Sequence, residues 1–461
     1  MVFSSITFLF YFLPIVLAVY YLVPKKCKNI VLLISSLAFY FYGEPKYTIL
    51  MLFSIACTYI FGLLIDKYPK HKKTFLIISI FISIGLLVYF KYINFIIQNI
   101  NLWLTNKIDF IYVVLPIGIS FYTFQMISYI IDVYRGQAKV QKNILKLAMY
   151  VSLFPQLIAG PIVRYTTIED QLENRTHTFE KFSIGVRRFI IGLGKKVLIA
   201  NVLGELTATF LASNEMSILY YWLYAIAAML QIYFDFSGYS DMAIGLGKMF
   251  GFDFLENFNY PYIATSITDF WRRWHISLSS WFRDYIYIPL GGNRVSKLKH
   301  LRNILVVWML TGLWHGAAWN FILWGTFFGI LLIIEKLFLG DFLKKLPKIL
   351  SRIYVLLIVM ISFIMFNGDS STQIFENIGG LIGIGDIPLV SNESIYYLKS
   401  YFVVIFVGVV GSTPMLKNVV NKSKMKKLIN LIEPIFLLSI LLICTSYIVD
   451  GSFNPFLYFR F

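Results

Sequence analysis

Two stretches decide the fold, Trp271-Arg-Arg-Trp-His-Ile-Ser-Leu-Ser-Ser-Trp-Phe-Arg-Asp-Tyr285 and Leu310-Thr-Gly-Leu-Trp-His-Gly-Ala-Ala-Trp-Asn320. Each places one histidine, His275 or His315, directly after a tryptophan, and the whole chain of 461 residues has only five histidines. The residues around both stretches are strongly apolar. An ionisable side chain near the apolar part of a bilayer is costly, so such a residue indicates a functional site.

The composition is that of a membrane protein. Hydrophobic residues make up 58% of the chain and charged residues only 14%, which is more apolar surface than a soluble domain of this size needs. With about twenty apolar residues per crossing, we expect about ten to thirteen candidate segments, several of them too short to span. Among these segments are 5–24, 47–65, 110–131, 217–236, 319–339, 396–411 and 431–449. The sequence therefore predicts an all-α polytopic membrane protein.

The formal charge of +17 is explained by loops that face anionic lipid, and we expect no nucleic-acid partner. Basic clusters flank the apolar segments, as in cytoplasmic loops. They lie at 25–28, 67–73, 135–142, 294–302, 344–352 and 417–427. The loop 367–395 has acidic residues and no Lys or Arg, so we expect it outside. This assignment predicts a multi-pass protein of the cytoplasmic membrane with both termini outside. We do not expect segment 5–24 to be a cleavable signal, since no basic region precedes it.

We expect one membrane-embedded domain over 1–461, with spanning helices at 1–131, a core at 144–339, spanning helices at 352–449 and an aromatic tail at 454–461. Proline and glycine interrupt the apolar stretches of the core. These residues are Pro155, Gly160, Pro161, Gly238, Pro261, Pro289, Gly291 and Gly292. Irregular backbone at membrane depth is tolerated only inside protein or around water, so the pattern favours broken or re-entrant helices around a central cavity or tunnel. Ordinary loops between helices are the alternative.

Two glycine-rich pieces, 192–196 and 245–251, lack the spacing of a phosphate-binding loop. They favour close contacts between helices instead, or helix ends with a lysine at the membrane interface. The three cysteines, Cys27, Cys57 and Cys444, have no CxxC spacing, and we predict neither a disulfide framework nor a metal site.

The histidines are placed to act on a proton. Segment 270–285 has a helical period with an aromatic and a polar face, and His275 falls at their boundary. His315 ends the short apolar stretch 304–314 and precedes the longer segment 319–339, which predicts a position inside the membrane. Imidazole can accept a hydroxyl proton near neutral pH. A buried histidine among tryptophans can equally be a satisfied core residue.

Several motifs together carry a resemblance to a known family. Besides the two histidine stretches, they are Phe154-Pro-Gln-Leu-Ile-Ala-Gly-Pro-Ile-Val-Arg164, Phe234-Asp-Phe-Ser-Gly-Tyr-Ser-Asp-Met-Ala-Ile-Gly245, Asn257-Phe-Asn-Tyr-Pro-Tyr262, Tyr285-Ile-Tyr-Ile-Pro-Leu-Gly-Gly292 and Asn454-Pro-Phe-Leu-Tyr-Phe-Arg-Phe461. In this order they resemble the membrane-bound O-acyltransferase family, in particular its bacterial alginate O-acetylation branch. The resemblance runs from about residue 110 to the end. Before that it is limited to the hydrophobic pattern.

The resemblance implies a bundle of the family type and an O-acetyltransferase with His315 as general base and His275 as a second catalytic or positioning residue. Tyr458 in the tail is a candidate acyl relay, or else part of an interfacial aromatic anchor. Further candidates for lining or positioning the site are Trp314, Asn320, Trp274 and Asp235, with a structural role favoured for Asp235.

The same resemblance implies acetyl-CoA as donor substrate, with no permanently bound cofactor and no metal. It also implies an extracytoplasmic acetyltransferase partner and a polysaccharide acceptor. D-alanyl transfer to teichoic acid by the same fold is the nearest alternative. A transporter or flippase without covalent chemistry is the alternative from another class.

Overall fold

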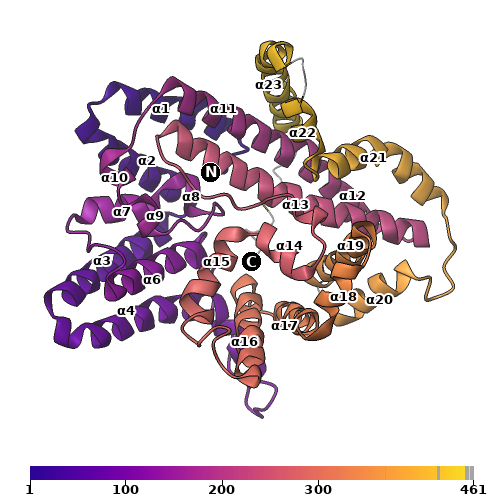
Figure 1. Cartoon of the computed structure of the whole chain (residues 1–461), viewed down its shortest axis with the longest axis horizontal. Helices are drawn as coiled ribbons and strands as arrows, with labels where there is room; N and C mark the ends of the chain where they lie inside the picture. Colours follow the sequence, from indigo (N-terminus) through magenta and orange to yellow (C-terminus); the bar gives the residue numbers. More distant parts are fainter. Residues whose placement is uncertain (369, 423–425, 452–455, 457–461) are drawn as a thin grey trace. The chain divides into compact units, whose positions relative to one another are not determined.

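The computed structural model describes residues 1–368, 370–422, 426–451 and 456. Every regular element in these residues is a helix, as Figure 1 shows, which confirms the predicted all-α class. The chain folds as two compact units, Met1–Phe189 with Ser240–Leu255, and Ile190–Tyr239 with Glu256–Phe461. Helices α11 (Phe179–Gly194) and α13 (Ile218–Met249) each contribute residues to both units. The sequence predicts a single domain over 1–461 with four parts, and that division stays a prediction.

The first unit holds the N-terminal helices, of which α3, α4 and α6 pack against one another. Its helices are α1 (Leu13–Leu22), α2 (Lys28–Gly43), α3 (Pro45–Lys67), α4 (Lys72–Leu87), α5 (Ile93–Ile100), α6 (Ile119–Arg135), α7 (Ile144–Ser152), α8 (Phe154–Leu157), α9 (Tyr165–Ile168) and α10 (Gln171–Asn174), with π-helical turns η1 (Thr7–Phe12) and η4 (Val88–Tyr92) and 3-10 turns η2 (Lys25–Cys27) and η3 (Pro69–His71).

The second unit holds both histidines, His315 at the end of α16 and His275 between α14 and α15. Its helices are α12 (Val202–Ala212), α14 (Ile267–Arg273), α15 (Ile276–Phe282), α16 (Lys297–His315), α17 (Trp319–Ile334), α18 (Gly340–Lys345), α19 (Lys348–Asn367), α20 (Ser371–Leu381), α21 (Asn392–Gly411), α22 (Met415–Lys422) and α23 (Lys426–Asp450), with π-helical turns η5 (Lys195–Asn201), η7 (Arg283–Tyr287) and η8 (Glu335–Leu339) and the 3-10 turn η6 (Pro261–Ile263).

Within the described residues, seven helices are long and apolar enough to cross a membrane. They are Pro45–Lys67, Pro69–Ile100, Ile218–Met249, Trp319–Lys345, Lys348–Asn367, Asn392–Gly411 and Leu428–Asp450, and Thr7–Leu22 is a shorter apolar helix. The chain is therefore a multi-pass membrane protein. These seven helices, together with apolar stretches that form helices too short to span or no helix at all, agree with the predicted set of candidate segments, several of them too short to span.

Segment 110–131 is one such case, and its predicted start is wrong. Residues 104–116 are not helical, and α6 begins only at Ile119. Gly118 precedes it with a φ of 76°, a left-handed conformation that glycine adopts without cost.

The predicted breaks of the core are mostly present. Backbone around Gly160 and Pro161 is irregular, Pro261 opens a 3-10 turn, and Gly291 and Gly292 lie in turns. The prediction is wrong at Gly238, which lies inside the uninterrupted helix α13. The cavity expected among these breaks stays a prediction.

Gly238 serves a close helix contact instead of a break. A Cβ there would lie 2.8 Å from the carbonyl oxygen of Gly192 in α11. In the first unit, a Cβ at Gly245 would likewise lie 2.7 Å from the carbonyl oxygen of Gly185. Small residues let the backbones of α11 and α13 approach in both units, so the close contacts predicted for the two glycine-rich pieces are confirmed.

Candidate active site

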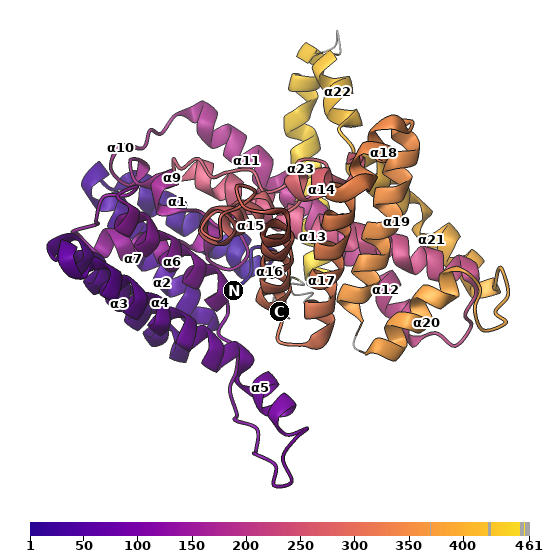
Figure 2. The ribbon, with the colours of Figure 1, turned by 60° about the horizontal axis from the view of Figure 1, so that its bottom comes forward.

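A tight helical hairpin of α16 and α17 positions His315. Both helices lie side by side in Figure 2. A Cβ at Gly312 would lie only 2.2 Å from the carbonyl oxygen of Phe321, and a Cβ at Gly325 only 2.3 Å from that of Trp308. The crossing therefore needs glycine at both positions. It holds the end of α16 rigidly, and His315 is the last residue of that helix and is buried.

Its hydrogen bond fixes the tautomer of His315. The Nδ1 atom lies 2.7 Å from the carbonyl oxygen of Thr311, one turn earlier in α16. A carbonyl can only accept, so Nδ1 carries the proton and Nε2 carries the lone pair of the neutral ring. The rings of Trp314 and Trp324, each with its centroid 5.0 Å from that of His315, and of Phe366 at 5.6 Å enclose the imidazole. His315 thus presents a base nitrogen in an aromatic surrounding.

His275 lies at a break between two short helices. The sequence predicts one helix over 270–285, and this prediction is wrong, because α14 ends at Arg273 and α15 begins at Ile276. His275 between them has φ 44° and ψ 53°, a left-handed conformation that costs a residue with a side chain about 1 to 3 kcal/mol. Such strain persists only where surrounding contacts impose it, and it is commonly found at functional sites.

Asn257 imposes the orientation of His275. Its Oδ1 accepts hydrogen bonds from the backbone N–H of Ser277 at 3.2 Å and from the Ser277 hydroxyl at 2.9 Å, and lies 3.1 Å from Nδ1 of His275. The backbone N–H can only donate, so the amide oxygen faces His275, and Nδ1 of the ring donates to it. As in His315, Nε2 carries the lone pair. Asn257 lies in one of the sequence motifs, but no local signal there predicts it as a site residue.

Glu335 is a second residue that the sequence analysis does not identify. This buried carboxylate accepts hydrogen bonds from the backbone N–H groups of Ile267, at 2.6 Å, and Thr268, at 2.9 Å, and from the Thr268 hydroxyl. These groups form the first turn of α14, where a helix has unsatisfied donors and a partial positive charge. Glu335 therefore fixes the start of the helix that leads to His275.

The rings of the two histidines both contact the ring of Trp314. Its ring centroid is 6.0 Å from that of His275 and 5.0 Å from that of His315. Burial, with a smaller contribution from the nearby His315, lowers the pKa of His275 well below its usual value. The His275 ring is therefore neutral. Phe236 of α13 covers another side of that ring, edge to face at 4.6 Å.

The remaining candidates lie at three different places in the second unit. Trp274 stacks on Phe270, 5.5 Å between centroids, in an aromatic cluster. The Asn320 side-chain amide donates to the carbonyl oxygen of Gly368 at 3.3 Å, which joins the start of α17 to the end of α19. Asp235 forms a buried ion pair with Lys196 between α13 and η5. These contacts stabilise the packing of the helices, and their roles in catalysis stay predictions.

Tyr458 lies outside the described residues, but a neighbour in the tail does not. Phe456 is buried, with its ring centroid 4.8 Å from that of Tyr239 and 5.8 Å from that of Phe236. Phe236 also contacts His275. Phe456 therefore packs inside protein, one ring away from His275, and not in lipid as an anchor residue would.

Comparison with known proteins identifies the class. The model of the membrane-bound O-acyltransferase family matches residues 137–372. The chain is 43% identical to a probable alginate O-acetylase of Azotobacter vinelandii, over 84% of this chain and 79% of the relative. It is 32% identical to the peptidoglycan O-acetyltransferase of Helicobacter pylori, over 98% and 90%, and 32% identical to the teichoic acid D-alanyltransferase of Bacillus subtilis, over 48% and 59%.

The chain belongs to the membrane-bound O-acyltransferase family and is an acyltransferase. The resemblance predicted from its motifs is confirmed. Because the members of this family are acyltransferases, the alternative of a transporter without covalent chemistry is excluded.

Proposed function

We propose that this protein takes an acetyl group from cytosolic acetyl-CoA and moves it across the membrane for O-acetylation of a cell-surface or extracellular polysaccharide. The names of two of its relatives, probable alginate O-acetylase and peptidoglycan O-acetyltransferase, support the acetyl group and this class of acceptor. The observation that carries the chemistry is the pair of buried histidines, each with its Nδ1 held by an oxygen acceptor and its lone pair on Nε2.

The reaction needs a base beside an acyl group. Nε2 of His315 removes the proton of an attacking hydroxyl while the hydroxyl oxygen bonds to the thioester carbon. When the carbon–sulfur bond breaks, the CoA thiolate leaves and takes the proton from the imidazolium, so that the products are an acetyl ester and CoA–SH. The Nδ1 bond to the Thr311 carbonyl oxygen stabilises the transient positive charge on His315. His275, whose ring also contacts Trp314, positions a reacting group.

Tyr458 is the acceptor that we propose for the first transfer. Its phenol takes the acetyl group, and a hydroxyl of the external acetyltransferase partner or of the polysaccharide then attacks the phenyl ester and restores the phenol. The burial of Phe456 next to Phe236, which contacts His275, supports this role because Phe456 is only two residues before Tyr458 in the sequence. A phenol is a weak nucleophile at neutral pH and needs a base such as His315.

A direct test uses the full chain in proteoliposomes with radiolabelled acetyl-CoA. We expect CoA release and transfer of label to added polysaccharide in the presence of the external partner. Label should not be transferred from D-alanyl carrier-protein thioester, the donor of the alternative reaction. The D-alanyltransferase relatives cover only about half of this chain, which makes that reaction the second candidate. Transfer of D-alanine in place of acetyl would contradict the proposal.

Tyr458→Phe tests the relay. The substitution keeps the ring and removes only the oxygen, so we expect polymer acetylation to fall to the level of the His315→Ala variant, measured as ester acetate on isolated polymer. Tyr458→Phe protein at normal abundance with wild-type acetylation would leave the tail only a structural role.

The proposed direction of transfer requires a defined topology, with both termini and loop 367–395 outside. In a variant whose three cysteines are replaced by serine, a membrane-impermeant thiol reagent should label Glu376→Cys in intact cells. It should label Ser296→Cys only after the cells are opened. Both positions are exposed. Labelling of Ser296→Cys in intact cells would invert the topology and place the donor on the wrong side.

A further inference from the structure

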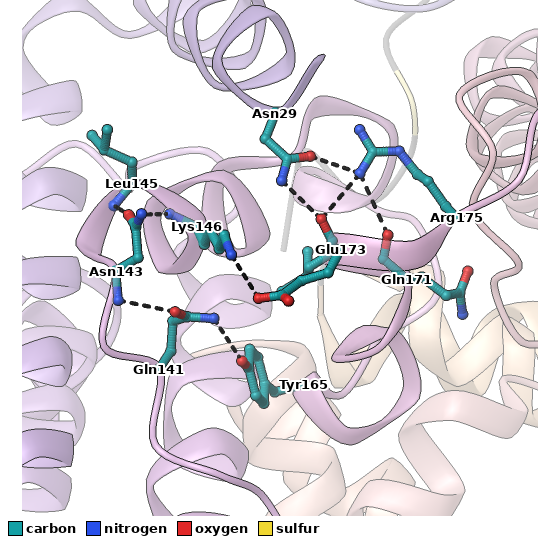
Figure 3. Close-up of polar contacts among 10 residues, drawn as sticks. Asn29, Gln141, Asn143, Leu145, Lys146, Tyr165, Gln171, Glu173 and Arg175 are labelled. Carbon is teal, nitrogen blue, oxygen red and sulfur yellow. Dashed lines mark hydrogen bonds and ion pairs between the residues drawn. The ribbon is translucent and has the colours of Figure 1, made fainter. Parts of the chain in front are cut away.

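Arg175, in the first unit, is a buried cation without a carboxylate partner. Its Nε donates to the hydroxyl of Tyr20 at 2.9 Å, and its Nη1 donates to Oδ1 of Asn29 at 2.6 Å. Nη1 also lies 3.4 Å from the carbonyl oxygens of Gln171 and Leu172 (Figure 3). No carboxylate lies within ion-pair distance of Arg175 among the residues that the structure describes, although only 8% of this residue is exposed.

Two carboxylates near Arg175, Glu173 and Asp253, have lysine partners. Glu173 points to Lys146, 2.6 Å away, on the side opposite to Arg175 (Figure 3). Asp253 accepts from Lys181 at 2.6 Å and from Lys248 at 3.0 Å. The structure thus provides acids for the neighbouring lysines and none for Arg175.

A second cation without a carboxylate lies on the same tyrosine. Nζ of Lys28 is 4.4 Å from the ring centroid of Tyr20 and 4.7 Å from that of Tyr21. With the described residues, Lys28 makes these two cation–π contacts. Burial and, to a smaller extent, Arg175 lower the pKa of Lys28, so the two cations are close enough to repel each other.

The pKa of His177 is affected by the same positive charges. Its Nε2 lies 2.7 Å from the Tyr20 hydroxyl. Burial first, and then Lys28, Arg175 and Lys181, lower its pKa to about 4. His177 is therefore neutral at physiological pH and does not add to the positive charge of Lys28 and Arg175.

Such an arrangement is costly unless an anion compensates it. The penalty for removing an ion from water is several kcal/mol, and a partner with opposite charge and hydrogen-bonding oxygens offsets it. The Nη2 atom of Arg175 bonds to no described residue and is not fully enclosed. A phosphate group fits these donors, since arginine and lysine both bind phosphate oxygens through charge-assisted hydrogen bonds.

The location indicates which molecule carries the phosphate. Tyr20 lies in the last turn of the apolar helix Thr7–Leu22, and Lys28 follows the basic turn η2. Val19 and Leu22 on the same helix are exposed, Leu22 to 84%, which is the character of a lipid-facing surface. The end of an apolar helix next to basic residues is at the depth of lipid headgroups.

We propose that Lys28 and Arg175, joined by Tyr20, form a binding site for the phosphate group of an anionic phospholipid. Its acyl chains lie along the exposed apolar residues of α1, and the lipid fixes the junction of α1, α2 and the segment after α10. The site is independent of the proposed catalytic function, because it needs neither histidine nor donor.

Lipid retention by the purified full chain tests the site. We expect the wild type, purified from nanodiscs containing equal amounts of phosphatidylglycerol and phosphatidylcholine, to retain phosphatidylglycerol selectively in native mass spectrometry. Lys28→Gln should reduce this retention about tenfold, since it removes one of two charges on the phosphate. Lys26→Gln is the matched control, because it removes an exposed charge two residues away and should retain the lipid like the wild type.

Arg175→Gln should abolish retention but also removes structural hydrogen bonds, so the Lys28 variant decides the result. Equal retention by Lys28→Gln and Lys26→Gln would overturn the site.

Inorganic phosphate distinguishes a site for a phospholipid headgroup from a site for soluble phosphate. If phosphate raises the unfolding temperature of the wild type but not of Lys28→Gln, while neither protein retains phosphatidylglycerol, the site binds soluble phosphate and the lipid assignment is wrong.

Discussion

The regions around His315 and His275 reach the same chemical state by different means. His315 receives its Nδ1 acceptor from the backbone of its own helix, four residues earlier, in a regular conformation. His275 receives its acceptor from the side chain of Asn257, eighteen residues away, and has a left-handed backbone. Both imidazoles have the lone pair on Nε2. Secondary structure thus supports His315, and tertiary contacts support His275.

This difference determines how each region responds to substitution. No side-chain change next to His315 removes a backbone carbonyl, so its tautomer is protected as long as α16 is folded. The tautomer of His275 depends on one amide oxygen that also holds the first turn of α15 through Ser277. The region of His275 is therefore the more sensitive to changes outside the histidine itself.

The largest effect is expected for His315→Ala. Loss of the general base should reduce acetyl transfer on the order of 10³-fold while the protein remains inserted and abundant, measured as labelled acetate on polymer in proteoliposomes. His300→Ala is the matched control, since His300 is a buried histidine of the same helix that pairs with Tyr287 at 2.9 Å. It should keep most of the activity. Normal acetylation by His315→Ala would refute the assignment of the base.

Asn257→Ala tests the tertiary support of His275. Loss of a positioning acceptor should reduce activity by about 10-fold to 100-fold. His275→Ala, which we expect to be severe, sets the upper limit of this loss.

Asn257→Asp keeps the oxygen acceptor but adds a negative charge, which raises the pKa of His275. The active, deprotonated ring then forms at higher pH, so the acidic limb of the pH–activity profile should move upward. A profile that does not move would reduce Asn257 to a packing residue.

Much of the fold can be predicted from the sequence because its signals are local. Apolar runs predict the spanning helices, and prolines such as Pro261 predict the interruptions. Gly238 is misread as a break because glycine disrupts a helix in water but permits close packing in a membrane. The left-handed residue His275 has no local signal, since its conformation is imposed by contacts to Asn257.

The site is predictable only in part for the same reason. His275 and His315 are conspicuous because histidine is rare in this chain and both follow tryptophan. Glu335 supports α14 from 67 residues away in sequence, and a single carboxylate in an apolar run gives no indication of its partner. Such contacts between distant segments become visible only in the folded chain.

The smallest effect is expected for Thr311→Val, which tests whether the orientation of His315 depends on a side chain. Thr311 is buried one turn before His315, and its hydroxyl donates to the carbonyl oxygen of Val307 at 2.8 Å. Valine has nearly the same shape and keeps the carbonyl that His315 uses. We expect acetyl transfer within about threefold of the wild type and a loss of about 1 kcal/mol in stability, the usual value of one hydrogen bond, measured by thermal unfolding. A loss of activity as large as that of Asn257→Ala would mean that His315 too depends on a side chain, and the distinction between the two regions would fail.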